Sequence, residues 1–343
     1  MRMTYAKAGV DIDRKSAAIA SLVKTLAFRR KGRGAMLDLE GHFTGLIDFG
    51  DYALSLCTDG VGTKLLVADA MEKWDTVGID CMANNVNDMI CAGAEPLAFV
   101  DYIALDEPDE AKTRQVGIGL DKGAEMANVT IIGGEIAVLP ELVRGFDLAG
   151  TCLGAVKKDR IITGAGIKPG DAIIGVRSSG VHSNGLTLAR KIVYTAGLGF
   201  QNDEPKLGRR WGDELLEPTE IYVRGVMAAV AKHEMHGMAN ITGGGLRNLI
   251  RLKKGLEYRI DEPQEPHEIF SLLQEMGNVE DREMYQTFNM GMGFAVVAPE
   301  GEAKGIIQTM KKAGHQSKIV GTIVKSKATK ATLPELGLSY DKY

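Results

Sequence analysis

The chain has 343 residues, of which 45% are hydrophobic and 25% charged, as is typical of a soluble globular protein of about two domains. This composition excludes a disordered chain, a coiled coil and a membrane protein. With 41 basic against 45 acidic residues the net charge is −4, which argues against a general nucleic-acid binder. Glycine is in excess, at 42 residues with only 10 prolines, which predicts tight turns and loops that approach a ligand closely.

The cysteines and the N-terminal residues indicate the cellular compartment of the protein. The four cysteines show no CxxC spacing and no nearby histidine at ligand spacing, so we expect reduced, buried thiols. Asp11 and Asp13 precede the first apolar stripe, unlike a signal peptide, and no run reaches the length of a membrane span. We therefore expect a cytoplasmic protein with no membrane partner. The four cysteines are Cys57, Cys81, Cys91 and Cys152.

Apolar spacing predicts alternating helices and strands in the first half of the chain, which indicates α/β or α+β layering. The basic loop 29–34 is interpreted as a solvated helix end, with a mobile phosphate-contacting segment as the alternative. Helices are expected over 15–28, 76–92 and 110–127, and strands over 52–58, 97–105, 129–132 and 147–156.

The glycine-bearing stretch 163–170 predicts a boundary between two domains, 1–165 and 166–343. The second half repeats the alternation, and the polar tail after residue 325 is expected to be peripheral. Helices are expected over 186–195, 218–231, 246–252, 268–276 and 301–313. Strands are expected over 172–177, 238–241, 293–298 and 317–324, with a strand and then a charged loop over 255–267.

The segment Thr58-Asp-Gly-Val-Gly-Thr-Lys64 follows an expected strand and combines three features of a phosphate site. It does not meet the Walker spacing. Gly60 and Gly62 let backbone N–H groups approach a phosphate, Asp59 is suited to Mg²⁺, and Lys64 to an anionic oxygen. We favour this function over a β-turn with a surface lysine, because seven residues hold all three features.

A polar stripe follows on the helix expected over 76–92. Asp80, Asn84, Asn87 and Asp88 lie at i, i+4, i+7 and i+8, so they share one helix face. Short oxygen-bearing side chains suit a hard cation, although a solvated face explains this stripe alone equally well.

Gly133-Gly134-Glu135 comes directly after an expected strand. A carboxylate after two glycines at a strand end fits a metal–phosphate site, whereas two glycines alone commonly just end a strand.

Two further glycine-bearing loops link strands to helices in the second half. Ser178-Ser-Gly-Val-His-Ser-Asn-Gly185 holds hydroxyls, an imidazole and an amide, the donors expected around a phosphate or a sugar. We favour a substrate role for His182 over a structural one. Thr242-Gly-Gly-Gly245 is suited to an anion-binding backbone nest. His233 and His236 are interpreted as a surface pair, without a third ligand.

These motifs, in their order along the chain, resemble those of the phosphoribosylformylglycinamidine cyclo-ligase (AIR synthetase) family. That family belongs to the AIR synthetase and selenophosphate synthetase superfamily. The resemblance covers about residues 4–325. Its N-terminal and His-Ser-Asn-Gly motifs separate this family from its superfamily relatives. Three further motifs carry it: Tyr5-Ala-Lys-Ala-Gly-Val-Asp-Ile-Asp13, Gly93-Ala-Glu-Pro96 and Met284-Tyr-Gln-Thr-Phe-Asn289.

The resemblance implies a two-domain fold, with N-terminal domains that form a joint β-barrel across a homodimer and a C-terminal domain of mixed sheet and helices. It implies ATP- and Mg²⁺-dependent ring closure of formylglycinamidine ribonucleotide (FGAM) to aminoimidazole ribonucleotide (AIR), with release of ADP and phosphate, through a phosphorylated amide oxygen.

The residue roles that the resemblance implies fall into four sets. The metal set is Asp59, Asp88 and Glu135. The nucleotide set is Gly60, Gly62, Thr63, Lys64, Asp80, Asn84, Gly133 and Gly134. The substrate set is Ser179, His182, Ser183, Asn184, Gly243, Gly244 and Gly245. The catalytic set is His182, Lys64 and Asp59.

Two departures from the family pattern concern the lid and the contacts to the ATP base. Ile136 follows Glu135 where bacterial members often have threonine, and residues 40–45 replace a glycine-rich stretch. Rival interpretations are a selenophosphate synthetase, a thiamine-phosphate kinase, a hydrogenase-maturation dehydratase and a silent nucleotide-binding protein. The first usually needs a reactive cysteine near the N-terminus and the third a C-terminal cysteine, but the first cysteine here is Cys57 and the chain ends at Tyr343.

Overall fold

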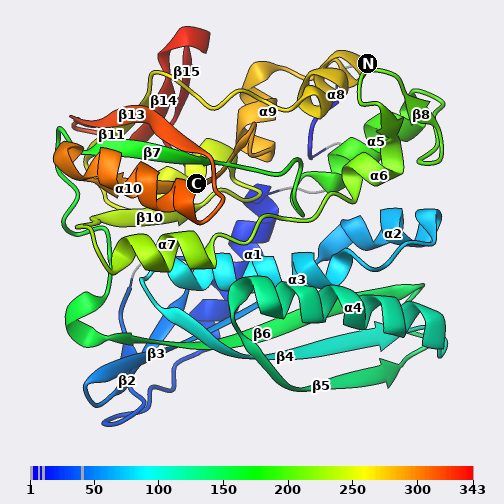
Figure 1. Cartoon of the computed structure of the whole chain (residues 1–343), viewed down its shortest axis with the longest axis horizontal. Coiled ribbons are helices and arrows are strands. Elements are labelled where there is room, and N and C mark those ends of the chain that lie inside the picture. The colour runs from blue at the N-terminus through cyan, green and yellow to red at the C-terminus, as the bar shows by residue number, and fades with distance from the viewer. Residues whose placement is uncertain (1–2, 7, 10–11, 40–41, 343) are drawn as a thin grey trace.

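The computed structural model of the protein describes residues 3–6, 8–9, 12–39 and 42–342, without the side chains of 12–16. Its two main sheets draw their strands from residues 36–157 and 172–340 (Figure 1). The fold class predicted from sequence, mixed α/β of the α+β kind, is confirmed. The boundary at 165/166 falls between the sheets and stays a prediction. Part of the N-terminal motif (Lys7, Val10, Asp11 and the Asp13 side chain) and Glu40–Gly41 lie outside the described residues.

The N-terminal sheet has six strands in the order β1-β2-β3-β6-β4-β5. Neighbours are antiparallel except β4 and β5, which helix α4 joins as a parallel β-α-β unit. Along β6 every second residue is buried, as expected where one sheet face packs against helices. The strands are β1 Met36–Leu37, β2 Gly45–Phe49, β3 Tyr52–Gly60, β4 Glu95–Leu105, β5 Thr130–Val138 and β6 Phe146–Lys157.

Helices α3 (Val77–Ile90) and α4 (Glu110–Ala127) cover one face of this sheet (Figure 1). The Asp109 carboxylate caps α4 by accepting a hydrogen bond from the backbone N–H of Lys112. The two helices approach so closely that a Cβ at Gly78 would lie 2.2 Å from the backbone nitrogen of Leu120. Glycine is therefore required at this crossing.

The C-terminal sheet has seven strands in the order β10-β12-β7-β13-β11-β14-β15. Helix α7 (Val223–Val230) packs with α10 (Glu300–Lys312), and α5 (Leu186–Thr195) packs with α8 (Glu268–Gly277). The strands are β7 Ala172–Arg177, β10 Gly237–Asn240, β11 Leu256–Ile260, β12 Met292–Ala298, β13 Ser317–Lys325, β14 Lys330–Leu333 and β15 Leu338–Tyr340. The remaining α-helices and the hairpin strands are α1 Ile12–Thr25, α2 Leu65–Met71, α6 Trp211–Leu215, α9 Asp281–Thr287, β8 Asp203–Glu204 and β9 Arg209–Arg210.

Four predictions about local structure in the second half of the chain were wrong. The tail after residue 325 is not peripheral, because β14 and β15 extend the sheet and Leu333 is fully buried. The helix expected over 218–231 begins only at Val223, since residues 217–222 bond to α3 instead. Residues 246–252 form most of a 3₁₀ helix rather than an α-helix. His236 is not on the surface: it is buried and bonds Asp171.

All four cysteines are buried and free, as predicted. Among the described residues, no helix is both long and apolar enough to cross a membrane.

Candidate active site

A row of paired residues crosses the N-terminal sheet at the end of β3. Asp59 pairs with Gly150 of β6, Gly150 with Asp101 of β4, and Asp101 with Gly134 of β5. Directly paired residues share a sheet face, and Cys57, two residues before Asp59, is buried on the face that α3 covers. A Cβ at Gly134 would lie 2.5 Å from the Asp101 carboxylate. Asp59 and Asp101 therefore lie on the α3 side of the sheet.

Glu135 lies on the opposite sheet face. It pairs with Tyr102, the next residue after Asp101, and is exposed. Gly133, Gly134 and Glu135 lie inside β5 rather than after a strand, because β5 continues to Val138. Within one chain the structure therefore does not bring Glu135 to Asp59.

Asp88 of α3 faces the same region as Asp59. Its Oδ1 accepts a hydrogen bond of 2.8 Å from Asn240 of β10. Desolvation raises the pKa of Asp88 to about 7, the bond from Asn240 opposes the rise, and the nearby negative charge of Asp59 adds to it. The structure thus brings two of the three predicted metal ligands near enough for the charge of Asp59 to affect Asp88.

The described residues hold no cluster of three acidic, histidine or cysteine side chains placed to bind a metal. The pair Asp59 and Asp88 nevertheless fits Mg²⁺, which takes one or two carboxylates together with phosphate oxygens. The raised pKa of Asp88 reflects a desolvated carboxylate beside a like charge, which a divalent cation would relieve.

The polar stripe of α3 is used mainly to hold other segments. The Asp80 carboxylate accepts from the backbone N–H and hydroxyl of Thr219, and the Asn87 amide donates to the carbonyl of Glu220. The Asn84 amide donates to the carbonyl of Gly60. In this structure Asp80, Asn84 and Asn87 therefore orient the phosphate-loop candidate and the 217–222 segment, and nucleotide contacts by Asp80 and Asn84 stay predictions.

Lys64 is fully buried and points away from solvent. Its ammonium donates to Asp80 Oδ1 at 2.9 Å and to the carbonyl of Glu217 at 2.6 Å. A phosphate contact by Lys64 stays a prediction; the observed contacts join the two halves of the chain.

His182 is held in an uncommon backbone conformation, with φ of 62°. It is buried, and its Nε2 accepts hydrogen bonds from the backbone N–H groups of Ser179 and Glu220. Burial lowers the pKa of His182 to about 3, and the positive charge of Lys64 contributes to the shift. The imidazole is therefore neutral at neutral pH and carries its proton on Nδ1.

The two loops predicted to bind substrate lie side by side. A Cβ at Gly243 would lie 3.0 Å from the Asn184 side chain. The 178–185 loop is tied down by Asn289, whose amide nitrogen donates to the carbonyl of Gly180 and whose amide oxygen accepts from the Ser178 hydroxyl. The motif 284–289 thus supports this loop.

The loop also touches the N-terminal half. The Ser183 hydroxyl donates to Asp80 Oδ1 at 3.2 Å, and the hydroxyls of Thr63 and Thr187 lie 3.0 Å apart. The predicted nucleotide segment and the predicted substrate loop therefore meet where the two halves of the chain join. Of the remaining predicted residues, Ser179 donates through its hydroxyl to the carbonyl of Pro218.

Asp101, Glu217 and Thr219 belong to this region but carry no motif. Asp101 interrupts the apolar strand Phe99–Ile103, and burial raises its pKa. A carboxylate inside an apolar strand is a signal that sequence alone offers. Glu217 contacts Lys64 only through its backbone carbonyl, and no sequence pattern predicts such a contact.

Comparison with known proteins places the chain in a family. Residues 41–156 match the AIR synthase related protein N-terminal domain, and residues 168–334 match the C-terminal domain of the same description. These matches define the class as AIR synthase related.

Within that class the chain belongs to the phosphoribosylformylglycinamidine cyclo-ligase family. It is 51% identical over 325 residues to a protein of that name from Methanosarcina barkeri, covering 94% of this chain and 96% of the relative. It is 47% identical over 327 residues to the protein of that name from Methanocaldococcus jannaschii, covering 94% and 93%.

Solved structures share the fold at low identity. The tt0281 protein of Thermus thermophilus aligns with a TM-score of 0.65 at 16% identity, covering 96% of this chain and 99% of the other. AaThiL, crystallised with AMPPCP and TMP, aligns with a TM-score of 0.65 at 16% identity, covering 94% of each chain. These similarities support the fold alone.

Proposed function

We propose that this chain catalyses the ATP-dependent closure of FGAM to AIR, with release of ADP and phosphate. The proposal rests on the extended identity to cyclo-ligases and on one structural observation. Ser183 of the predicted substrate loop bonds Asp80, which also holds Lys64 of the predicted phosphate segment. Two ligands bound at these segments would lie next to each other, as a phosphoryl transfer between them requires.

The chemistry needs little covalent help from the protein. An amide oxygen is a poor leaving group, so the γ-phosphoryl group of ATP passes to it and gives ADP and an imidoyl phosphate. A nitrogen of the same substrate then attacks that carbon, the C–O bond breaks, and phosphate leaves. Loss of a proton from the nitrogen completes the ring. Positioning and charge neutralisation are the main tasks of such a site.

The residues that would hold Mg²⁺ are Asp59 and Asp88. When bound, the metal neutralises charge on the ATP phosphates. Glu135 lies on the sheet face opposite to that of Asp59. It would therefore not approach the metal from the same side of the sheet as Asp59.

His182 suits a positioning role better than a proton shuttle. Its Nε2 is already occupied by two backbone donors, and its pKa of about 3 keeps it neutral. A neutral imidazole with Nδ1–H can donate one hydrogen bond to a substrate oxygen.

We further propose a cytoplasmic homodimer, in which residues 1–165 form the ATP, Mg²⁺ and dimerisation domain and residues 166–343 the substrate side. Leu56, Val100 and Tyr102 lie on the sheet face opposite α3 and are 56%, 36% and 42% exposed. Such an apolar sheet face marks an interaction surface, and a joint β-barrel would cover it. The free buried cysteines agree with a reducing compartment.

The test is a reconstituted reaction with FGAM, ATP and Mg²⁺. We expect AIR and ADP in equal amounts, with no product when ATP or Mg²⁺ is left out. A cyclo-ligase of established activity is the positive control. If that control turns over and the present chain does not, the proposed function is wrong.

A further inference from the structure

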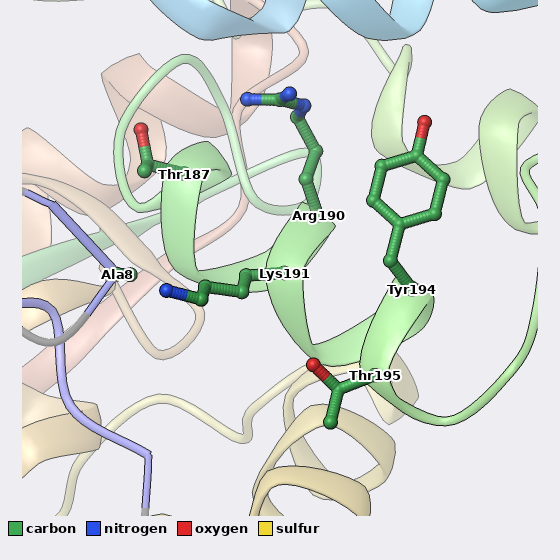
Figure 2. Close-up of a pocket in the computed structure, with 6 residues that line it drawn as sticks. All are labelled: Ala8, Thr187, Arg190, Lys191, Tyr194 and Thr195. Atoms are coloured by element: carbon green, nitrogen blue, oxygen red, sulfur yellow. The ribbon is translucent and has the colours of Figure 1, made fainter.

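A cavity of about 340 Å³ lies between α5 and the N-terminal segment (Figure 2). Among the described residues, its lining offers two cations and three hydroxyl groups and no carboxylate. Such a set of donors is typical of a site for an anion. The lining residues are Ala8 of the N-terminal segment and Thr187, Arg190, Lys191, Tyr194 and Thr195 of α5.

Arg190 is the most informative of these residues. Its Nε is buried and has no hydrogen-bond partner among the described residues. Burial lowers the pKa of Arg190, and the nearby phenol of Tyr194 acts in the other direction. Buried donors in folded proteins almost always have a partner, so a buried guanidinium nitrogen without one calls for a ligand.

The cavity adjoins the candidate active site. The Thr187 hydroxyl lies 3.0 Å from that of Thr63 in the phosphate segment. The Tyr5 phenol, three residues before Ala8, is hydrogen-bonded to the backbone of Gly185, where the His182 loop ends, and burial raises its pKa. Ala8 and α5 therefore line a space next to the predicted nucleotide segment and the predicted substrate loop.

We infer that this cavity binds the phosphate monoester of the ribonucleotide substrate, with Arg190 as the main contact and Thr187 as a supporting contact. The inference rests on the proposed function. In Figure 2 the side chains of Arg190 and Thr187 project toward the same side of α5, while the Lys191 ammonium extends toward Ala8. A guanidinium fork matches two phosphate oxygens, and its partial burial strengthens the pairing.

The spacing along α5 suits the two ends of one ligand. Arg190 is four residues beyond Leu186, the first residue of the helix, which is about 6 Å along the axis. Since the 178–185 loop ends directly before Leu186, the inferred site places the ribose between the phosphate at Arg190 and an amide near that loop.

The experiment measures KM for FGAM and for ATP separately in three variants. We expect Arg190→Gln to raise KM for FGAM roughly ten- to hundredfold, the usual effect of losing a hydrogen bond to a charged group. KM for ATP and kcat should change little, because the contact is made equally in ground and transition states. Arg190→Lys should restore part of the affinity. Arg114→Ala, which removes a guanidinium from α4, is the matched control and should behave as wild type.

Direct binding of ribose 5-phosphate, measured by calorimetry, supplies a readout independent of turnover. We expect wild type and Arg114→Ala to bind it and Arg190→Gln to lose at least tenfold in affinity. An Arg190→Gln variant that folds, cyclises FGAM and keeps the wild-type KM for FGAM overturns the inference alone, as does a rise confined to KM for ATP. A wild type that binds ribose 5-phosphate through Arg190 but forms no AIR overturns the proposed function and supports the phosphate site.

Discussion

Lys64 and Asp80 form an ion pair of 2.9 Å in which both side chains are fully buried. The same Asp80 oxygen also accepts from Thr219 and Ser183, and the Lys64 ammonium donates to the carbonyl of Glu217. The other oxygen of Asp80 is buried and has no partner in the part of the chain that the structure describes. The pair therefore joins the phosphate segment, α3 and the 217–222 segment at the point where substrates are expected to meet.

Breaking this pair should be costly. Lys64→Met leaves the Asp80 carboxylate buried and unpaired, and we expect a loss of about 3–5 kcal/mol in the free energy of unfolding. Adding Asp80→Asn in the same chain should recover part of that loss. Urea unfolding measures both. Lys158→Met removes the exposed pair with Asp48 and should cost under about 1 kcal/mol. Equal losses for the buried and exposed pairs would contradict the structural role.

Asp88→Asn should weaken metal use without destabilising the protein. Removing a charged metal contact should lower the apparent Mg²⁺ affinity in the ATP reaction by roughly 10–100-fold. Asp121→Asn, an exposed change on α4, is the control. Full activity of Asp88→Asn at limiting Mg²⁺ would contradict the proposal that Asp88 binds the metal.

His182 should stay neutral far below its ordinary pKa. With a folded pKa of about 3 against 6.5 when unfolded, its contribution to stability is present above pH 6.5 and is lost as the pH falls toward 3. Nitrogen NMR of the labelled imidazole should show a neutral ring at pH 5. His182→Asn, which tolerates the positive φ, should flatten the acid limb of the stability profile. An imidazolium signal at pH 6 would refute the buried neutral state.

The exposed sheet face predicts the oligomeric state. Tyr102→Glu places a charge on that face, and we expect it to convert a dimer to a monomer in sedimentation experiments. Tyr194→Glu, which changes an exposed aromatic on α5, should remain a dimer. If wild type is itself monomeric at micromolar concentration, the proposed barrel is wrong.

Gly185 is required by the loop that carries His182. Its φ is 80°, and a Cβ there would lie 2.4 Å from the Phe288 ring. Gly185→Ala should therefore cost more than about 1 kcal/mol of stability. Gly197→Ala, with φ of 75° and open space around it, is the matched control and should cost less. Similar losses of stability in the two variants would mean that backbone strain alone, without the Phe288 contact, explains why glycine is required at position 185.

Local sequence patterns were sufficient to predict most helices and strands and to identify the family. Helix α4, strand β7 and helix α5 have the predicted bounds because their apolar period and glycine boundaries lie within the element itself. The order of the glycine-bearing motifs was enough to identify the family resemblance. Short strands such as β14 and β15 carry too few residues for such a period to show.

Tertiary structure decided which face each carboxylate occupies. Ile131 pairs with Phe99 and Gly133 with Val100, so Ile132 is an extra residue in β5. This irregularity turns Glu135 to the face opposite Asp59, because one residue of slip moves a side chain to the other side of a sheet. The sequence by itself determined the motifs and their chemistry. Long-range pairing decided that Asp80 holds Lys64 and that Ala8 meets α5 around Arg190, since such contacts depend on residues far apart in the chain.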